Sequence, residues 1–150
     1  MIRDYLEEDL EEIVDIAICF EKESNLFQRT GGVNREIFKN NLRQYYKKGM
    51  LKIWVVEERK KITAALGVII GKDILSGQTG INELFWYSHP EFRGSISNIK
   101  LIKKMEKYAI SINAKYIMMF HLSHFKEKQL NRFYMKTGYK KCQSQYIKAL

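Results

Sequence analysis

The sequence has little cysteine, and its two thiols lie far apart. Cys19 and Cys142 are the only cysteines of the 150 residues. Two distant thiols do not make the disulfide framework that is typical of small secreted domains. We therefore expect a protein that folds without disulfides and works in the cytoplasm.

Long apolar runs are also missing. A membrane-spanning helix needs roughly 18 or more consecutive apolar residues, and here Lys, Glu or Asn interrupts every candidate run. The N-terminal residues Met1–Tyr5 lack the basic stretch and apolar core of a signal peptide. We expect no membrane partner.

Proline and linker composition are sparse as well. Pro90 is the only proline, and no internal repeat or segment rich in Gly, Pro or Ser divides the chain. A length of 150 residues suits one compact unit. We expect a single domain over residues 1–150.

What the sequence does have is an uneven positive charge. The net charge is +9, but residues 1–25 hold nine Asp and Glu against Arg3 and Lys22, a net of −7, so the remainder carries +16. Such a basic body attracts polyanions, among them nucleic acid, acidic proteins and phosphorylated cofactors. It suits a small, acidic or phosphorylated substrate better than a polyamine.

The pattern of apolar residues predicts alternating strands and helices in the order β-α-α-β-β-β-α-β-α-β. Strands are expected at 2–5, 53–56, 62–70, 81–88 and 116–120 and from Tyr139 onward, and helices from about 9, over 34–48, around 101–112 and over 126–137. Local hairpins followed by strand–helix units indicate an α/β fold with a mixed central sheet and helices on both faces.

Capping residues support the predicted helices. Asp9 and Glu12 have the spacing of a capping box, and Asn34 is a good N-cap for the second helix. Helical spacing predicts two buried stripes: Leu10, Ile13, Val14, Ala17 and Phe20, then Phe38, Leu42 and Tyr45. Gly49 and Gly138 are expected to end helices in a left-handed conformation.

The segment that carries chemistry follows the third long strand. Residues 83–98 read ELFWYSHPEFRGSISN, a strand that runs through a tight Arg93-Gly94-Ser95 turn directly into a helix. A helix N-terminus presents free N–H groups and positive electrostatic potential, so it binds phosphate well. Gly94 lets the backbone approach a ligand, and Arg93 adds positive charge.

This segment resembles the GNAT superfamily of acyl-CoA N-acyltransferases. His89-Pro90-Glu91-Phe92-Arg93-Gly94 is similar to the family's Pro-Glu-Tyr-Arg-Gly form, in which Arg/Gln-x-x-Gly-x-Gly/Ala opens a helix. Phe133–Tyr139 (FYMKTGY) is similar to the family's Tyr-x-Lys-x-Gly-Phe ending, and Ile2-Arg3 with an Asp-led helix resembles its opening. The likeness covers nearly the whole chain and is strongest to compact bacteriophage and bacterial members.

The resemblance implies an N-acetyltransferase with a splayed sheet. It transfers the acetyl group of acetyl-CoA directly to a primary amine of an unidentified acceptor, without a metal. Glu83 is then the candidate general base and Tyr134 the candidate acid for the leaving thiolate. The backbone of Trp86, Tyr87 and Ser88 is expected to pair with the pantetheine arm. The pyrophosphate is expected at Arg93, Gly94, Ser95, Ile96, Ser97, Asn98 and Ile99.

The sequence departs from the family pattern at three positions. Ile96 and Asn98 stand where the motif has small residues, and Glu127 stands where the family often has Asn. Ile96 is compatible with the site if its side chain points away from the ligand. Asn98 either crowds the pyrophosphate or donates to it. A GNAT-fold module that binds or inhibits without catalysis is therefore an alternative. A second alternative, which the +16 body suggests, is a basic nucleic-acid-binding protein.

Each site residue also has a plainer interpretation. Glu83 fits a solvated strand residue, Tyr134 fits the helix's apolar stripe, and the aromatic run at 85–87 fits a core strand better than a base-stacking surface. The lysine face of the predicted 101–112 helix fits a solvated surface better than a nucleic-acid site. That face consists of Lys100, Lys103, Lys104 and Lys107. His121 and His124 lack the partners of a metal site. A homodimer through the last strand is compatible with such a fold.

Overall fold

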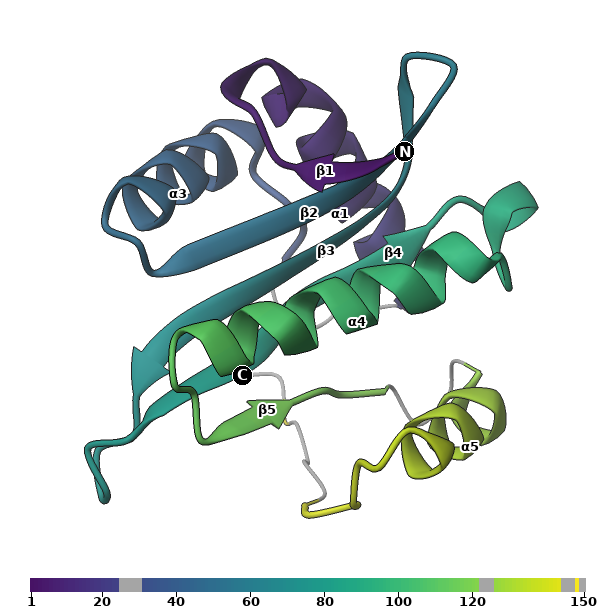
Figure 1. Ribbon diagram of the computed structural model, residues 1–150. Coiled ribbons are helices and arrows are strands. Elements are labelled where there is room, and N and C mark those ends of the chain that lie inside the picture. Colours follow the sequence, from purple (N-terminus) through teal and green to yellow (C-terminus); the bar gives the residue numbers. More distant parts are fainter. Residues whose placement is uncertain (25–30, 122–125, 144–147, 149–150) are drawn as a thin grey trace.

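The computed structural model describes residues 1–24, 31–121, 126–143 and 148. Its core is a five-stranded mixed sheet in the order β1-β2-β3-β4-β5 (Figure 1). The strands are β1 (Ile2–Asp4), β2 (Leu51–Glu58), β3 (Lys61–Lys72), β4 (Thr79–Ser88) and β5 (Tyr116–Met118). Neighbours are antiparallel except for β4 and β5, which run parallel.

Helices cover both faces of this sheet, as the sequence predicts. The 3-10 turn η1 (Glu7–Asp9) leads into α1 (Leu10–Ser24), and α1 and α3 (Arg35–Lys47) lie on one face. The turn η2 (Pro90–Phe92) leads into α4 (Ile96–Ser111), which crosses the other face. The last described helix, α5 (Glu127–Lys136), lies beyond the end of β5.

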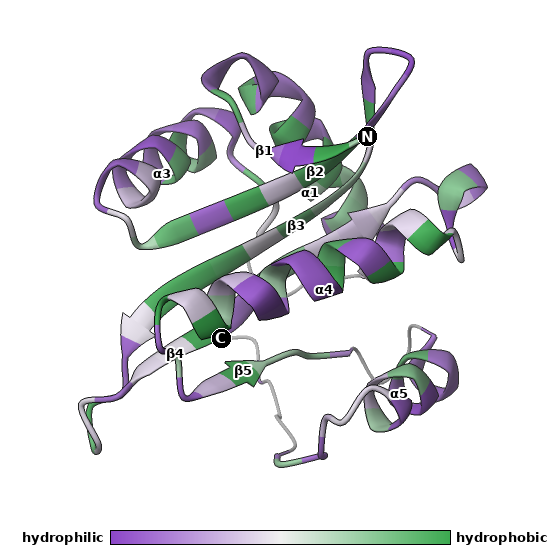
Figure 2. Cartoon of the chain, viewed as in Figure 1, coloured by the Kyte–Doolittle hydropathy of each residue, from purple (hydrophilic) through white to green (hydrophobic). Residues whose placement is uncertain are grey.

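Two apolar layers hold the helices to the sheet. Beneath α1 and α3, residues such as Ile13, Val14, Leu42, Ile53 and Phe85 form one buried cluster. Beneath α4, a second cluster consists of Trp54, Val56, Ala64, Leu66, Val68, Ile81, Leu101, Ile102, Met105 and Ala109. Figure 2 shows the apolar stripe of α4 turned toward the strands and its polar stripe turned outward. Burial of these side chains is the main force that fixes the layers.

A bulge in β4 lets one strand serve both layers. Val68 pairs with Glu83 and Gly67 pairs with Phe85, so Leu84 is an extra residue in β4. Strand side chains alternate between faces, and one inserted residue therefore reverses the alternation. As a result, Ile81 and Trp86 lie on the α4 side although five positions separate them, while Phe85 packs on the α1 side.

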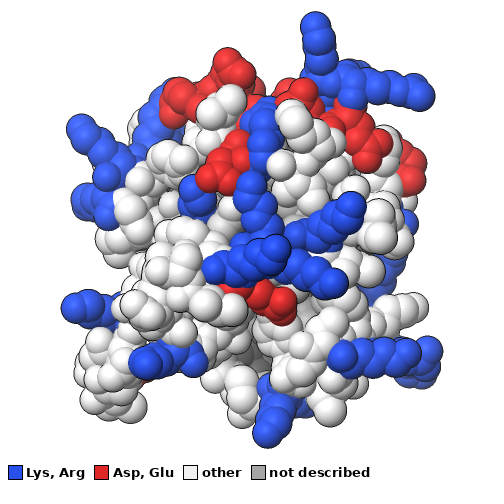
Figure 3. All heavy atoms as spheres, viewed as in Figure 1, with Lys and Arg blue, Asp and Glu red and all other residues white. Residues whose placement is uncertain are grey.

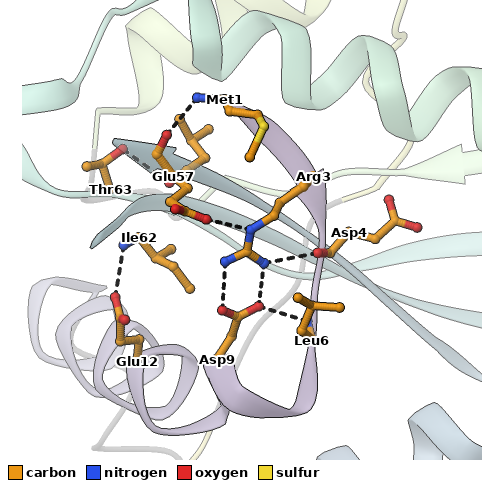
Figure 4. A network of polar contacts seen from close by, with 10 residues as sticks. Met1, Arg3, Asp4, Leu6, Asp9, Glu12, Glu57, Ile62 and Thr63 are labelled. Carbon is orange, nitrogen blue, oxygen red and sulfur yellow. Dashed lines mark hydrogen bonds and ion pairs between the residues drawn. The ribbon is translucent and has the colours of Figure 1, made fainter. Parts of the chain in front are cut away.

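An ion-pair network ties the N-terminus to the sheet (Figure 4). Arg3 donates two hydrogen bonds to the Asp9 carboxylate, at 2.6 and 2.8 Å, and one to Glu57 at 2.6 Å. Burial favours the neutral form of Asp9, but hydrogen bonds from Arg3 and from the Leu6 N–H outweigh it and hold its pKa below the usual range. The N-terminal segment is thereby fixed against β2.

The predicted capping box at Asp9 and Glu12 is wrong. Asp9 accepts the Leu6 N–H at 2.8 Å, while the Glu12 carboxylate accepts the Ile62 N–H at 2.9 Å and so braces β3. By contrast, the Asn34 cap is confirmed, since its side chain accepts the Ile37 N–H at 3.0 Å. Gly49 and Gly138 have the expected positive φ, at 69° and 93°.

Three other expectations need correction. Tyr45 is 41% exposed rather than buried, and Leu42 and Phe38 of the predicted stripe pack against the cluster beneath α1 and α3. The fifth strand ends at Met118 instead of Phe120 and is only partly buried. Residues 139–143 form no strand, and the rest of the tail predicted to be a strand, except residue 148, lies outside the described residues.

Charge is unevenly spread over the surface. On the face in Figure 3, most acidic side chains gather near the top, where β1 and the β2–β3 turn lie, and Lys and Arg spread over the rest. On α4, Lys104 pairs with Asp4 at 2.9 Å, whereas Lys100, Lys103 and Lys107 are exposed. None of the helices in the described part of the chain combines the length and apolar character that crossing a bilayer requires.

Candidate active site

The site begins where β4 and β5 separate. The two strands pair only at Gly80–Asn82 and Tyr116–Met118. Beyond that point, the Phe120 N–H donates to the Glu83 carboxylate at 3.1 Å and not to the backbone of β4. The ladder therefore stops, and the edge of β4 from Glu83 to Ser88 that faces away from β3 has no partner strand among the described residues.

A cleft of about 410 Å³ opens along this edge. This volume lies within the usual range for small-molecule sites, roughly 300 to 1,000 Å³. Its walls come from α1, β4, the η2–α4 connection, the end of β5, and α5. The lining residues are Phe20, Glu23, Glu83, Trp86, Tyr87, Ser88, Arg93, Gly94, Ser95, Asn98, Ile99, Phe120, His121, Lys126, Gln129, Leu130, Phe133 and Tyr134.

Glu83 and Tyr134, the two residues predicted to carry out proton transfer, lie together in this cleft. The Tyr134 hydroxyl donates to the Phe120 carbonyl at 3.3 Å, and the Glu83 carboxylate accepts the N–H of the same residue. The backbone of one residue just past β5 thus aligns both side chains.

The environment of this pair changes both protonation equilibria. Burial raises the pKa of Glu83 to about 8, although hydrogen bonds from the Phe120 N–H and Tyr134 act in the opposite direction. Burial, together with the charge of Glu83, raises the pKa of Tyr134 far above its usual value. Tyr134 therefore keeps its proton at any working pH and is available as a donor, while Glu83 titrates near the pH at which enzymes operate.

At the other end of the cleft, the predicted phosphate loop is braced from within the protein. Arg93 donates to the Ser88 carbonyl at 2.9 Å and to Glu23 of α1 at 2.5 Å. The second Glu23 oxygen accepts the Tyr87 hydroxyl at 3.1 Å. Arg93 thus holds the loop against β4 and α1, so its charge is already partnered by a carboxylate.

The start of α4 keeps the features of an anion site. Gly94 has a φ of 77°, and a side chain there would meet no atom within 4 Å. The first N–H groups of a helix have no acceptor inside the helix, so those at the start of α4 are directed toward the cleft end where Ser95 lies. Ile96 is 68% exposed, and neither Ile96 nor Ser97 lines the cleft with its side chain.

The Asn98 amide is already bonded within the protein. Asn98 is 8% exposed, and its amide donates to the Phe92 carbonyl at 3.0 Å and to the Ser88 hydroxyl at 3.3 Å. The side chain is therefore held between η2 and β4. It braces the loop, which a glycine would not do, and Asn98 lines the cleft together with Ile99.

Sequence reasoning missed several residues of the cleft. Glu23 is counted above only in the net charge of residues 1–25, and its partner Arg93 is 70 residues away in sequence. His121 is considered there only as a metal ligand, and His124 lies outside the described residues. Within the described ranges, no group of three or more His, Cys, Asp and Glu side chains could hold a metal ion.

The architecture is similar to that of solved acetyltransferases. An aminoglycoside acetyltransferase from an uncultured soil metagenomic sample superposes with a TM-score of 0.78 at 13% identity, over 100% of this chain and 97% of that one. A GNAT family acetyltransferase from Staphylococcus aureus gives 0.70 at 16% identity, over 100% and 98%. The chain has the GNAT fold.

A further neighbour with the GNAT fold is a predicted acetyltransferase from Clostridium acetobutylicum, solved with acetyl-CoA. It gives a TM-score of 0.74 at 14% identity, over 98% of this chain and 94% of that one. No protein-family model matches the sequence, and no curated protein sequence does. The similarity to GNAT proteins is thus one of fold, and it leaves activity to be argued from the cleft.

Proposed function

We propose that the protein is an N-acetyltransferase that transfers an acetyl group from acetyl-CoA directly to a primary amine. The observation that carries the proposal is the unpaired edge of β4. It runs from the Glu83–Tyr134 pair at one end to the α4 N-terminus at the other. A thioester with a long arm and a terminal phosphate group needs these three features in this order.

In this proposal the backbone of Trp86, Tyr87 and Ser88 hydrogen-bonds the amide groups of the pantetheine arm, as an added strand does. The segment from Gly94 to Ile99 holds the pyrophosphate through N–H groups other than those of Ser95 and Asn98, which donate to the Phe92 and Ser95 carbonyls. The acetyl-CoA bound in the Clostridium acetobutylicum neighbour supports this choice of co-substrate.

The chemistry then falls to the pair at the strand divergence. Glu83 accepts a proton from the attacking nitrogen, and Tyr134 protonates the sulfur when the carbon–sulfur bond breaks. Tyr134 is suited to this role because its raised pKa keeps the hydroxyl protonated. In this proposal Glu83 returns a proton to Tyr134 after each turnover, because both side chains meet at the backbone of Phe120.

Calorimetric titration with acetyl-CoA tests the first half of the proposal. We expect micromolar binding that weakens about tenfold, roughly 1.4 kcal/mol, in Arg93→Ala, because the loop loses its anchor on Ser88 and Glu23. Arg43→Ala is the matched control, since Arg43 on α3 pairs with Glu7 at 2.6 Å and does not line the cleft. No binding at millimolar acetyl-CoA would overturn the enzyme proposal.

A binding module without catalysis is the second candidate, and the Glu23–Arg93 ion pair favours it. Glu23 already neutralises the Arg93 charge that is expected to attract phosphate. A protein that descends from an enzyme and has lost catalysis would tolerate this change. The two candidates separate on turnover. Acetyl-CoA binding with release of free thiol in the presence of amines supports the enzyme, and binding without release supports the module.

A further inference from the structure

Among the described residues, one buried polar side-chain atom has no hydrogen-bond partner: Nδ1 of His121. His121 lines the cleft just past the end of β5, and the residue as a whole is partly exposed. A buried nitrogen without a partner costs free energy, so such groups are rare unless a ligand or a reaction uses them. The Glu83–Tyr134 mechanism proposed above does not use it.

Its position places it beside the proposed reaction. Phe120, the preceding residue, binds Glu83 through its N–H and Tyr134 through its carbonyl, and adjacent Cα atoms lie only about 3.8 Å apart. The other charged and titratable groups that line this cleft are Glu23 on α1, Tyr87 on β4, Arg93 before α4, and Lys126 just before α5. Arg93 is held by Glu23, so His121 remains the group without an assigned partner.

The proposed reaction removes two protons from the nitrogen of the acceptor. An ammonium ion carries three N–H bonds, and the amide product of a primary amine carries one, so two protons leave the nitrogen. One of them ends on the sulfur of the thiol product, and the other must leave the site. The Glu83–Tyr134 pair handles the proton that goes to sulfur, because Glu83 takes it from the nitrogen and Tyr134 delivers one to the thiolate.

We propose that His121 is the second base, which removes the first proton from the acceptor ammonium through Nδ1. The inference rests on the proposed acetyl transfer. Nδ1 takes a proton and leaves a neutral amine, whose lone pair attacks the thioester carbonyl carbon. The carbon–sulfur bond breaks, the thiolate takes the Tyr134 proton, and Glu83 passes the second nitrogen proton to Tyr134. His121 then releases its proton from Nδ1 to water that enters the cleft after the products leave.

Two acceptors of different protonation state test this role. At a pH slightly above 8, the approximate pKa of Glu83, hydroxylamine is neutral, whereas ethylamine is still an ammonium ion. The variant is His121→Asn, whose amide still hydrogen-bonds but cannot take a proton. His89→Asn is the matched control, because His89 does not line the cleft. Acetyl transfer from acetyl-CoA is followed by thiol release after subtraction of the enzyme-free rate.

With ethylamine, we expect kcat of His121→Asn to fall about 100-fold, the low end of general base contributions. With hydroxylamine, we expect less than about a threefold change, because that acceptor no longer needs the first deprotonation. His89→Asn should behave like the wild type with both.

Equal losses with both acceptors would reduce His121 to a structural or binding role, and no loss with ethylamine would remove it from the mechanism. Either result overturns the second-base proposal while leaving acetyl transfer intact. By contrast, a wild-type protein that acetylates neither amine, even at the highest soluble concentration, would overturn the proposed function itself, and the inference with it.

Discussion

The two halves of β4 belong to one strand but have different partners. The closed half, from Thr79 to Asn82, has β3 on one side and, at Gly80–Asn82, β5 on the other. The open half, from Glu83 to Ser88, has only β3 as a partner strand among the described residues, and its second edge borders the cleft. The closed half contributes to the sheet's stability, and the open half is the part to which we assign binding and chemistry in the proposed function. The Leu84 bulge marks the boundary.

Deletion of Leu84 should break this division most severely. Without the extra residue, the side chains on one side of the bulge change faces, so either Ile81 or Phe85 leaves its core layer. We expect the loss of a cooperative thermal transition and of acetyl-CoA binding. Leu84→Ala keeps the bulge and is the control, with a loss of about 1 kcal/mol or less in the free energy of unfolding. A deletion variant that unfolds like the wild type would show that the bulge does not set the register.

Glu83→Gln addresses the first residue of the open half. We expect the acetylation rate to fall about 100-fold, because the amide cannot accept a proton. Wild-type activity should rise with pH toward about 8, the pKa of Glu83, and the variant should lack this dependence. A pH–rate profile measured for both proteins checks this, and an unchanged profile would assign the titration to another group.

Glu83→Gln should lower the activity but raise the stability of the fold at alkaline pH. The Glu83 pKa is raised from 4.5 to about 8 by burial, so the folded state binds this proton more tightly than the unfolded state does. Its stabilising contribution is complete below pH 4.5 and is lost as pH rises through 8. We therefore expect Glu83→Gln to become more stable than the wild type at alkaline pH, by a few kcal/mol at most.

Two glycines of β3 test how tightly the chain packs opposite the two halves of β4. Gly67 pairs with Phe85 in the open half, and an added Cβ would lie 2.7 Å from that buried ring. Gly71 pairs with Gly80 in the closed half, and a Cβ there would meet nothing within 4 Å. Chemical denaturation should show that Gly67→Ala loses about 1 to 3 kcal/mol, whereas Gly71→Ala is neutral or slightly stabilising. Equal effects would mean that Phe85 moves aside freely.

Asn98→Gly restores the residue that the motif favours, and we expect a small loss and not a gain. The amide bonds to Phe92 and Ser88 disappear, so acetyl-CoA affinity should fall a few-fold and unfolding should cost about 1 kcal/mol less. Tighter binding in calorimetry would instead show that Asn98 obstructs the phosphates.

Much of the fold was predictable because its signals are local. Helical spacing gave α1 and α4, turn residues gave the β2–β3 hairpin, and Asn34 marked the start of α3. The length of β5 was not predictable, since it ends where the Glu83 side chain takes the Phe120 N–H. The bulge was equally hidden, because Leu84-Phe85-Trp86-Tyr87 is apolar on both faces and shows no break in alternation.

In the candidate site, too, only the features encoded by local sequence were predictable. The Arg93-Gly94 turn and Tyr134 were recognisable from short sequence patterns, but the Glu23–Arg93 pair depends on a contact across 70 residues. The role of Asn98 as a brace depends on where Phe92 and Ser88 come to lie. A partnerless atom such as Nδ1 of His121 becomes visible only when all its neighbours are placed.

The open half of β4 also fixes the distance between the two ends of the proposed site. Five residue steps separate Glu83 from Ser88, and at about 3.3 Å per residue they span roughly 16 Å between the proton-transfer pair and the α4 N-terminus. In the proposed function, a donor must be long enough to contact both sites at once. Acetyl phosphate, whose anionic and acyl ends are adjacent, would contact one site or the other but not both, so we expect the protein to discriminate against such short donors.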